Sequence, residues 1–153
     1  MNDKLTHLDE QGRASMVDVS SKNVVRRTAT ASACFVAKNT TIEAIMQGNV
    51  PKGEALAVAR LAGIQAAKNC GSMIPLCHPL PLECVSVSFE QIAPEKILIT
   101  ATTVITAKTG IEMEALAAVS AAALTLWDMS KAIDTDLLVT EIRLLEKKKE
   151  SLE

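Results

Sequence analysis

Aromatic side chains are nearly absent from this chain of 153 residues: phenylalanine and tryptophan together make up 2% of it, and there is no tyrosine. Hydrophobic residues nevertheless account for 48% of the sequence. The core must therefore consist of alanine, valine, isoleucine, leucine and methionine rather than of rings, and such small side chains favour close packing between helices. The length is that of a single domain able to bury a substantial core.

An excess of basic residues is also missing, because the formal net charge is -2. This balance argues against a surface for nucleic acids, which needs a basic face. Residues 115–127 form a run of thirteen residues without a charge, which falls short of the roughly 20 residues that span a bilayer. No apolar segment near the N-terminus resembles a secretion signal. We therefore expect a soluble cytoplasmic protein with no membrane partner.

Ligand sets for a metal ion are missing too. The four cysteines have no C-x-x-C spacing, and only two histidines, His7 and His78, could join them. Zinc usually takes four such ligands, so we expect no metal site and interpret the cysteines as buried reduced thiols. The loop motifs of nucleotide-binding proteins, zinc peptidases and serine hydrolases are absent as well. The cysteines are Cys34, Cys70, Cys77 and Cys84.

The apolar pattern alternates between the periods of strands and of helices. We predict an irregular arm over residues 1–27, a single ferredoxin-like domain over 28–146 and a charged tail over 147–153. The element order β-α-α-β-β-α-β is the split βαβ arrangement if the two early helices count as one unit, so we predict an α+β fold with helices on one face of a four-stranded antiparallel sheet. The predicted elements are a strand over 28–36, a helix from 40 or 41 to Gly48, a helix over 54–69, two hairpin strands over 85–90 and 97–105, a long helix over 112–133 and a strand over 138–145.

Local signals mark the boundaries of some elements. Two Thr-x-x-Glu spacings, Thr40 with Glu43 and Thr109 with Glu112, predict capping boxes at the starts of the first and last helices. Residues 74–82 read IPLCHPLPL and contain three prolines. Each proline removes a backbone donor and restricts the residue before it, so this segment is predicted to be an extended, ordered loop.

The long helix over 112–133 carries charges only near its ends. Glu112 and Glu114 open it, and Asp128 and Lys131 close it. Two apolar rows lie between these ends, and one sheet cannot cover both, so we expect other subunits to do so. The first row runs through Leu116, Val119, Ala123 and Leu126, and the second through Met113, Leu124 and Trp127.

Several polar residues are candidates for chemistry, and each has a structural alternative. His78 lies in an apolar segment and could act as acid, base or phosphate donor, or be satisfied by a backbone carbonyl. Asp128 and Lys131 are three residues apart on a helix and could handle protons as a pair, or form an ordinary exposed ion pair. Lys52 follows Pro51 in a tight turn and could meet an anion, or be a solvated loop lysine.

The two glutamates at the helix start have alternatives of the same kind. Glu112 could be the acid of the capping box, and Glu114 a first-turn acid favoured by the helix dipole. Glu114 and Asp128 lie within about 40° on one helix face but roughly 21 Å apart along it. They cannot serve one reacting atom within one chain, so either the ligand is long or a symmetry-related helix brings the two ends together.

Six segments carry specific motifs in a fixed order: MVDVS at 16–20, the Pro-Lys-Gly turn at 51–53, AGIQAAK at 62–68, IPLCHPLPL at 74–82, KTGIEMEAL at 108–116 and DMSKA at 128–132. Together they resemble the MoaC family, the cyclic pyranopterin monophosphate synthases of molybdenum-cofactor biosynthesis. The resemblance extends over nearly the whole chain.

The resemblance implies a ferredoxin-like subunit assembled as a homohexamer, a trimer of dimers, with active sites at the dimer interfaces. It also implies a non-redox lyase reaction on a purine-derived triphosphate. A radical SAM enzyme makes 3′,8-cyclo-7,8-dihydroguanosine triphosphate from GTP, and the family converts it to cyclic pyranopterin monophosphate while pyrophosphate leaves. Contact with that radical SAM enzyme is a further expectation. No cofactor is expected to be required, and Mg²⁺ on the triphosphate is compatible with this chemistry.

Residue roles follow from the resemblance, motif by motif. Asp128 is implied to be the catalytic acid or base, with Lys131 as its partner and Lys52 as a further catalytic lysine. Opening and reclosing rings requires protons at several atoms, which suits such a set. The implied substrate-binding residues are Leu76, Cys77 and His78 in one loop, Met113 and Glu114 in a second element, and Glu112, Lys68 and Arg26 beyond these.

The chain departs from the family at its C-terminus. Relatives tend to end in a flexible Gly-Lys-Ser-Gly segment, whereas residues 146–150 read EKKKE here. If that segment covers the triphosphate in relatives, this chain lacks its glycines, and Lys147, Lys148 and Lys149 could replace its charge. Two non-catalytic interpretations remain open: a ferredoxin-like module that sequesters a nucleotide, and a scaffold for the radical enzyme.

Overall fold

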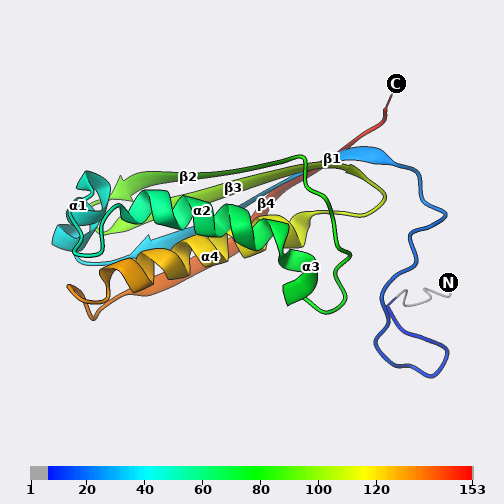
Figure 1. The fold of residues 1–153 in the computed structure, drawn as a ribbon, viewed down its shortest axis with the longest axis horizontal. Helices are drawn as coiled ribbons and strands as arrows, with labels where there is room; N and C mark the ends of the chain where they lie inside the picture. The colour runs from blue at the N-terminus through cyan, green and yellow to red at the C-terminus, as the bar shows by residue number, and fades with distance from the viewer. Residues whose placement is uncertain (1–6, 153) are drawn as a thin grey trace.

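The computed structural model describes residues 7–152. Its elements follow the order β-α-α-α-β-β-α-β, which is the predicted order with one additional short helix (Figure 1). The elements are β1 (Val25–Val36), α1 (Asn39–Gln47), α2 (Ala55–Lys68), α3 (Cys70–Met73), β2 (Cys84–Ala93), β3 (Lys96–Ala107), α4 (Glu112–Ser130) and β4 (Leu138–Glu150).

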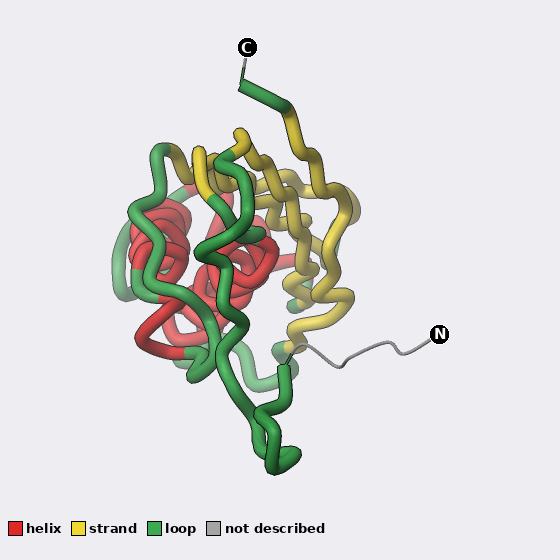
Figure 2. The backbone as a smooth tube through the Cα atoms, turned by 90° about the vertical axis from the view of Figure 1, so that its right-hand side faces the viewer, coloured by secondary structure: helices red, strands yellow, loops and turns green. Residues whose placement is uncertain are grey.

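The four strands form one antiparallel sheet in the order β2-β3-β1-β4. β1 is central, with Ala31 opposite Ala101 of β3 and Leu144 of β4. The helices lie together on one face of this sheet (Figure 2). The predicted α+β class, a ferredoxin-like fold with helices on one face of a four-stranded antiparallel sheet, is therefore confirmed.

Small aliphatic side chains build the core between the sheet and α4. The helix-facing residues of β1 are alanines followed by Phe35, and those of β3 are mostly isoleucines. Opposite them, Val119, Ala123 and Leu126 of α4 are fully buried. The core thus rests on aliphatic packing with a single large ring, as the composition predicts.

α2 and α4 approach each other closely at Gly63. A Cβ atom on Gly63 would lie 2.9 Å from the carbonyl oxygen of Ala118 and 3.1 Å from Cγ2 of Val87. A side chain of any size would push the two helices apart, so the glycine sets their spacing. This spacing matters because α4 carries candidate site residues at both of its ends.

The prediction that one side of α4 stays uncovered by the sheet is confirmed for the single chain. Leu124 is 63% exposed, and Met113 and Trp127 are 39% and 37% exposed. The sheet and α2 cover only the opposite side of the helix, and a row of large apolar side chains remains on the surface. No helix within residues 7–152 is both long and apolar enough to cross a bilayer.

Several element boundaries differ from the prediction. β4 does not end at residue 145 but continues to Glu150, because residues of the expected tail pair with β1, for example Lys149 opposite Arg27. β1 begins at Val25, inside the arm expected to be irregular. α4 ends at Ser130 and a turn follows, so it is shorter than predicted, and the helix α3 was missed.

Neither predicted capping box forms. Thr40 lies inside α1, and the helix is capped from a distance instead. The carboxylate of Asp134 accepts hydrogen bonds from the Lys38 amide and the Thr41 hydroxyl, both at 2.9 Å. α4 begins without any side-chain cap. The predicted stop of α1 at Gly48 is confirmed, since this residue adopts φ 72° and its amide bonds back to the last turn.

The four cysteines are free thiols, as expected. Cys34 and Cys70 are buried, but Cys77 is half-buried and Cys84 is exposed. The expectation that all four are buried is therefore wrong for the last two. Cys77 is partly accessible because it lines a pocket.

Candidate functional site

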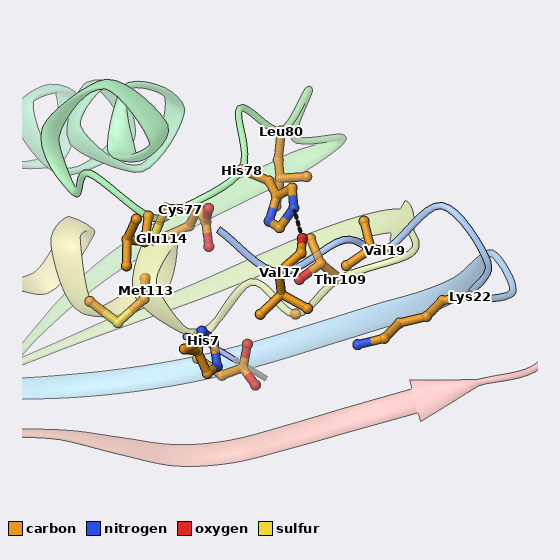
Figure 3. A pocket seen from close by; sticks show the side chains of 13 residues that line it. His7, Val17, Val19, Lys22, Cys77, His78, Leu80, Thr109, Met113 and Glu114 are labelled. Carbon is orange, nitrogen blue, oxygen red and sulfur yellow. Dashed lines mark hydrogen bonds between the residues drawn. The ribbon is translucent and has the colours of Figure 1, made fainter. Parts of the chain in front are cut away.

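A pocket of about 300 Å³ lies at the N-terminal end of α4. Three segments far apart in the sequence form it: the N-terminal arm, the proline-rich loop after α3 and the turn into α4 (Figure 3). The structure brings six of the residues predicted for the site together here. They are Leu76, Cys77, His78, Glu112, Met113 and Glu114.

The proline-rich loop holds His78 against the arm. Its ring nitrogen Nε2 lies 2.9 Å from the carbonyl oxygen of Val17 (Figure 3). A carbonyl oxygen only accepts, so Nε2 carries the proton and donates it, and Nδ1 is the acceptor in a neutral ring. Gly71 allows this close packing, because a Cβ there would lie 2.9 Å from the His78 carbonyl oxygen. Nε2 therefore has the structural role considered above, and Nδ1 has no hydrogen-bond partner within residues 7–152.

Glu114 is the most deeply buried ionisable group of the pocket, with 3% of its surface exposed. Burial raises the pKa of its carboxyl, and the neighbouring charge of Glu112 adds to the effect. Burial and the Glu114 charge also raise the pKa of two nearby thiols, that of Cys77 and that of Cys70, the latter to about 12. The surroundings of Glu114 thus favour neutral thiols and a ligand that donates hydrogen bonds to the carboxylate.

Glu112 forms an ion pair with Lys147 of β4. Burial is the largest single effect and would raise its pKa, but the hydrogen bond and charge of Lys147, its own backbone amide and the charge of Arg27 together outweigh burial, so the pKa of Glu112 is lowered. Gly110 makes room for this conformation, because a Cβ there would overlap the Glu112 carboxylate. The predicted capping-box role of Glu112 is therefore wrong, and a lysine expected in the tail, Lys147, is the partner of this pocket residue.

Arg27 was missed by the sequence reasoning, which selected Arg26 instead. The buried guanidinium of Arg27 donates to the carbonyl oxygens of Ala107 at 3.1 Å and Lys108 at 3.0 Å, so it fixes the turn that leads into α4. Arg26 is exposed and lies 3.9 Å from Glu150, away from the pocket. The strand period contains the signal that was overlooked, because Arg27 shares the helix-facing side of β1 with the buried alanines.

A second cluster lies at the other end of α4. The carboxylate of Asp128 accepts hydrogen bonds from Nζ of Lys131 and from Nζ of Lys52, each at 2.8 Å. These two ammonium groups, Lys131 first, lower the pKa of Asp128 to about 2. Lys52 reaches the carboxylate from a turn closed by the bond from the Gly53 amide to the Val50 carbonyl oxygen. The cluster can therefore offer two positive charges and two proton donors to a ligand.

The remaining candidate, Lys68, belongs to neither cluster. It is exposed at the end of α2, beside a shallow hollow on the outer side of the proline-rich loop. The two clusters themselves are separated by most of α4, since Glu114 and Asp128 lie about 21 Å apart along the helix. A single chain thus presents two half-sites, with Lys52 and Asp128 in the same one.

Comparison with known proteins identifies one family whose model covers the residues of both clusters. The model of the MoaC family matches residues 16–150 of this chain. That range includes the arm segment at the pocket, the proline-rich loop, both ends of α4 and all of β4.

Curated relatives are similar over almost the whole chain. Cyclic pyranopterin monophosphate synthase 3 of Mycobacterium tuberculosis (strain ATCC 25618 / H37Rv) is 51% identical over 150 residues, which cover 96% of this chain and 85% of the relative. Synthase 1 of the same strain is 51% identical over 143 residues, covering 94% and 84%. The synthase of Desulfitobacterium hafniense (strain DSM 10664 / DCB-2) is 50% identical over 144 residues, covering 94% and 88%.

Proposed function

The chain belongs to the MoaC family, and we propose from this premise that it catalyses the reaction for which its relatives are named. It converts (8S)-3′,8-cyclo-7,8-dihydroguanosine 5′-triphosphate to cyclic pyranopterin monophosphate and releases pyrophosphate. The reaction is a step of molybdenum-cofactor biosynthesis.

The observation that carries the proposal is the pair of ammonium groups on one carboxylate at the C-terminal end of α4. The reaction opens the imidazole ring of the purine and closes a pyrazine ring, so protons must be delivered and removed at several atoms. An internal hydroxyl must also attack the α-phosphorus while pyrophosphate leaves, which requires positive charge near the departing oxygens. Lys52 and Lys131, each 2.8 Å from Asp128, supply both proton donors and charge.

Asp128 has an orienting role before the substrate binds. A carboxyl with a pKa of about 2 is ionised at neutral pH, so Asp128 has no proton to deliver while both lysines are bound to it. Asp128 can take up a proton only after the substrate has drawn one ammonium group away, because the loss of that partner raises its pKa. The implied role as acid or base is thus restricted to steps that follow substrate binding.

The pocket at the other end of α4 suits the base of the substrate. A guanine-derived ring presents N–H donors along one edge, and the buried carboxylate of Glu114 is an acceptor without competing water. Nδ1 of His78 offers a second acceptor in a neutral ring. Met113 lines the same pocket with a polarisable thioether that packs well against a ring.

A complete site requires residues from two chains in this proposal. The chain is expected to form a homohexamer, a trimer of dimers, in which the Asp128 end of one α4 approaches the Glu114 end of another. Inactive Asp128→Asn and Glu114→Ala proteins, unfolded together and refolded, should then regain about a quarter of wild-type activity by random dimer statistics. Lys52→Ala with Asp128→Asn should not complement, because these two side chains touch within one chain. Equal results for the two pairs would contradict the shared site.

The surroundings of the reaction are part of the same proposal. Four free thiols suit the reducing cytoplasm. No group of three or more His, Cys, Asp or Glu side chains within residues 7–152 is arranged to hold a metal ion. Separately, no cofactor is proposed for the protein, and any Mg²⁺ would arrive on the triphosphate. Contact with the radical SAM enzyme would shorten the path of an unstable substrate between the two proteins.

A turnover assay distinguishes this function from the non-catalytic alternatives. The purified protein is mixed with the cyclised GTP derivative, and pyrophosphate and the fluorescent oxidised pterin are measured. The proposal predicts both products with wild-type protein and neither with Asp128→Asn. A nucleotide-sequestering module would bind the substrate without releasing pyrophosphate, and a scaffold would bind only the radical enzyme.

A further inference from the structure

The N-terminal arm forms one wall of the pocket without being part of a helix or strand. We call residues 15–22 the strap. Val17, Val19 and Lys22 of the strap line the pocket opposite Met113 and Glu114 (Figure 3). The two valines are only half-buried, so apolar packing contributes little to holding the strap in place.

The strap has a compact turn of its own. The Asp18 carboxylate accepts a hydrogen bond from the Ser20 amide at 2.8 Å, and the Lys22 amide donates to the Val19 carbonyl oxygen at 3.0 Å. These bonds shape the strap but do not attach it to the domain. Its position across the pocket therefore depends on bonds to residues outside the arm.

Among the residues that the structure describes, two hydrogen bonds make that attachment. Nε2 of His78 donates to the Val17 carbonyl oxygen at 2.9 Å, and Nζ of Lys108 donates to the Ser20 carbonyl oxygen at 2.6 Å. Lys108 is itself fixed, because the buried guanidinium of Arg27 binds its carbonyl oxygen at 3.0 Å. The backbone of Lys108 is thus held in place, and its side chain reaches the strap at Ser20, three residues beyond the contact of His78 with Val17.

The geometry points to Lys108 as a positioning residue that latches the strap over the pocket and, through Val17, holds the His78 ring with its proton on Nε2. Without the latch the strap loses its charged contact and the Val17 carbonyl oxygen is no longer held at the ring. The pocket then opens on one side, and His78 can exchange its two tautomers. This inference rests on the proposed function where it concerns the substrate, but the latch itself can be tested without turnover.

The test compares Lys108→Met, which keeps the length of the side chain but removes the donor, with Lys108→Arg, which keeps a donor. The matched control is Lys96→Met, which removes a lysine hydrogen bond of 2.8 Å to Glu141 at the opposite end of β3. Hydrogen–deuterium exchange is followed at the Ser20 and Lys22 amides. Nitrogen-15 spectra report which nitrogen of His78 carries the proton.

In Lys108→Met we expect the strap amides to exchange their hydrogens about three- to tenfold faster than in the wild type, as the loss of one net hydrogen bond implies. The share of His78 with its proton on Nδ1 should rise in the same variant. Lys108→Arg should restore most of both properties, and Lys96→Met should leave them unchanged. With the cyclised GTP derivative, Lys108→Met should raise KM about three- to tenfold while kcat changes little.

Each outcome decides the inference. Unchanged exchange of the strap amides in Lys108→Met overturns the latch, whatever the activity. Faster exchange with an unchanged His78 tautomer overturns the positioning of the ring, and faster exchange with an unchanged KM overturns the contribution of the strap to the site. Absence of turnover in the wild-type protein refutes the proposed function instead, and exchange and tautomer still decide whether Lys108 latches the strap.

Discussion

Replacing Glu114 by glutamine should make the folded protein more stable at neutral pH while it weakens the site. The wild-type carboxylate is 3% exposed, and its own backbone amide is the donor that favours its charged form. Burial therefore destabilises the charged group by more than this hydrogen bond stabilises it, which is why the pKa of Glu114 is raised. A neutral amide of the same shape avoids most of this cost.

The dependence on pH follows from the direction of that pKa shift. A carboxyl whose pKa is higher in the folded state binds its proton more tightly when folded than when unfolded. Its stabilising contribution is fully present below the unfolded pKa of about 4.3 and is lost as the pH rises through the folded pKa. Glu114→Gln should match the wild type near pH 4 and be more stable by roughly 1–2 kcal/mol above the folded pKa of Glu114, where the wild-type group is charged.

Chemical unfolding at a series of pH values measures this difference, and Glu112→Gln is the control. Glu112 lies on the same helix turn, but its pKa is lowered, because Lys147, the Glu112 backbone amide and Arg27 together outweigh the large effect of burial. Its contribution is present above the unfolded pKa and is lost on acidification, so Glu112→Gln should be less stable than the wild type at pH 8. If both substitutions change stability in the same direction and with the same pH profile, the assignment of the buried charge to Glu114 is wrong.

Three further predictions concern the two ends of α4 and its packing. Asp128→Asn and Lys131→Ala should each lower turnover by about 10²- to 10⁴-fold. The thermal midpoint of unfolding should shift by less than about 2 °C, since both side chains are more than half exposed. A large loss of stability would show instead that the pair has a structural role. Gly63→Ala should lower the free energy of unfolding by about 1–3 kcal/mol, because its Cβ would lie 2.9 Å from the Ala118 carbonyl oxygen. An unchanged denaturant midpoint would show that α2 and α4 can move apart without loss of stability. His78→Ala should weaken substrate binding or turnover, and elemental analysis of the wild-type protein should find no stoichiometric transition metal; one zinc per chain would contradict this.

Most of the fold was predictable because its signals are local. Val85, Val87 and Phe89 alternate with serines in β2, and Gly48 ends α1 through a left-handed conformation that glycine adopts without strain. The extension of β4 to Glu150 was not predictable in this way. As an edge strand it is exposed along most of its length, so it has no apolar alternation, and only the ladder with β1 reveals it.

The helix starts show the same limit of local reasoning. Thr40 and Thr109 have the correct spacing for capping boxes, but tertiary contacts take the place of the box at both helix starts. The α1 start is capped by Asp134, which is 96 residues from Lys38 in the sequence. A capping box stabilises a helix start by about 1 kcal/mol. A buried carboxylate that accepts several hydrogen bonds stabilises it by more, because its bonds are charge-assisted.

The candidate site was predictable where its contacts are short in sequence. The spacing of Asp128 and Lys131 by three residues on a helix predicts their contact, and the structure confirms it. The contact of Lys52 with Asp128 spans 76 residues and depends on where the turn after α1 packs, which no spacing reveals. Arg27 could have been found from the strand period, whereas Lys108 is recognisable only once the arm is seen across the pocket.

α4 explains why the charged residues of this chain are divided between two places. Its small side chains let the sheet and α2 pack against it closely, which makes the helix a rigid spacer. A rigid spacer keeps Glu114 and Asp128 about 21 Å apart, so no rotation of side chains can unite them within one chain. The side of α4 that carries Leu124 and Trp127 is left uncovered by the same packing. The division of the site and the exposed apolar row therefore have one physical cause. A second copy of the helix packed against this row would cover it and would bring the Asp128 end of one chain to the Glu114 end of the other.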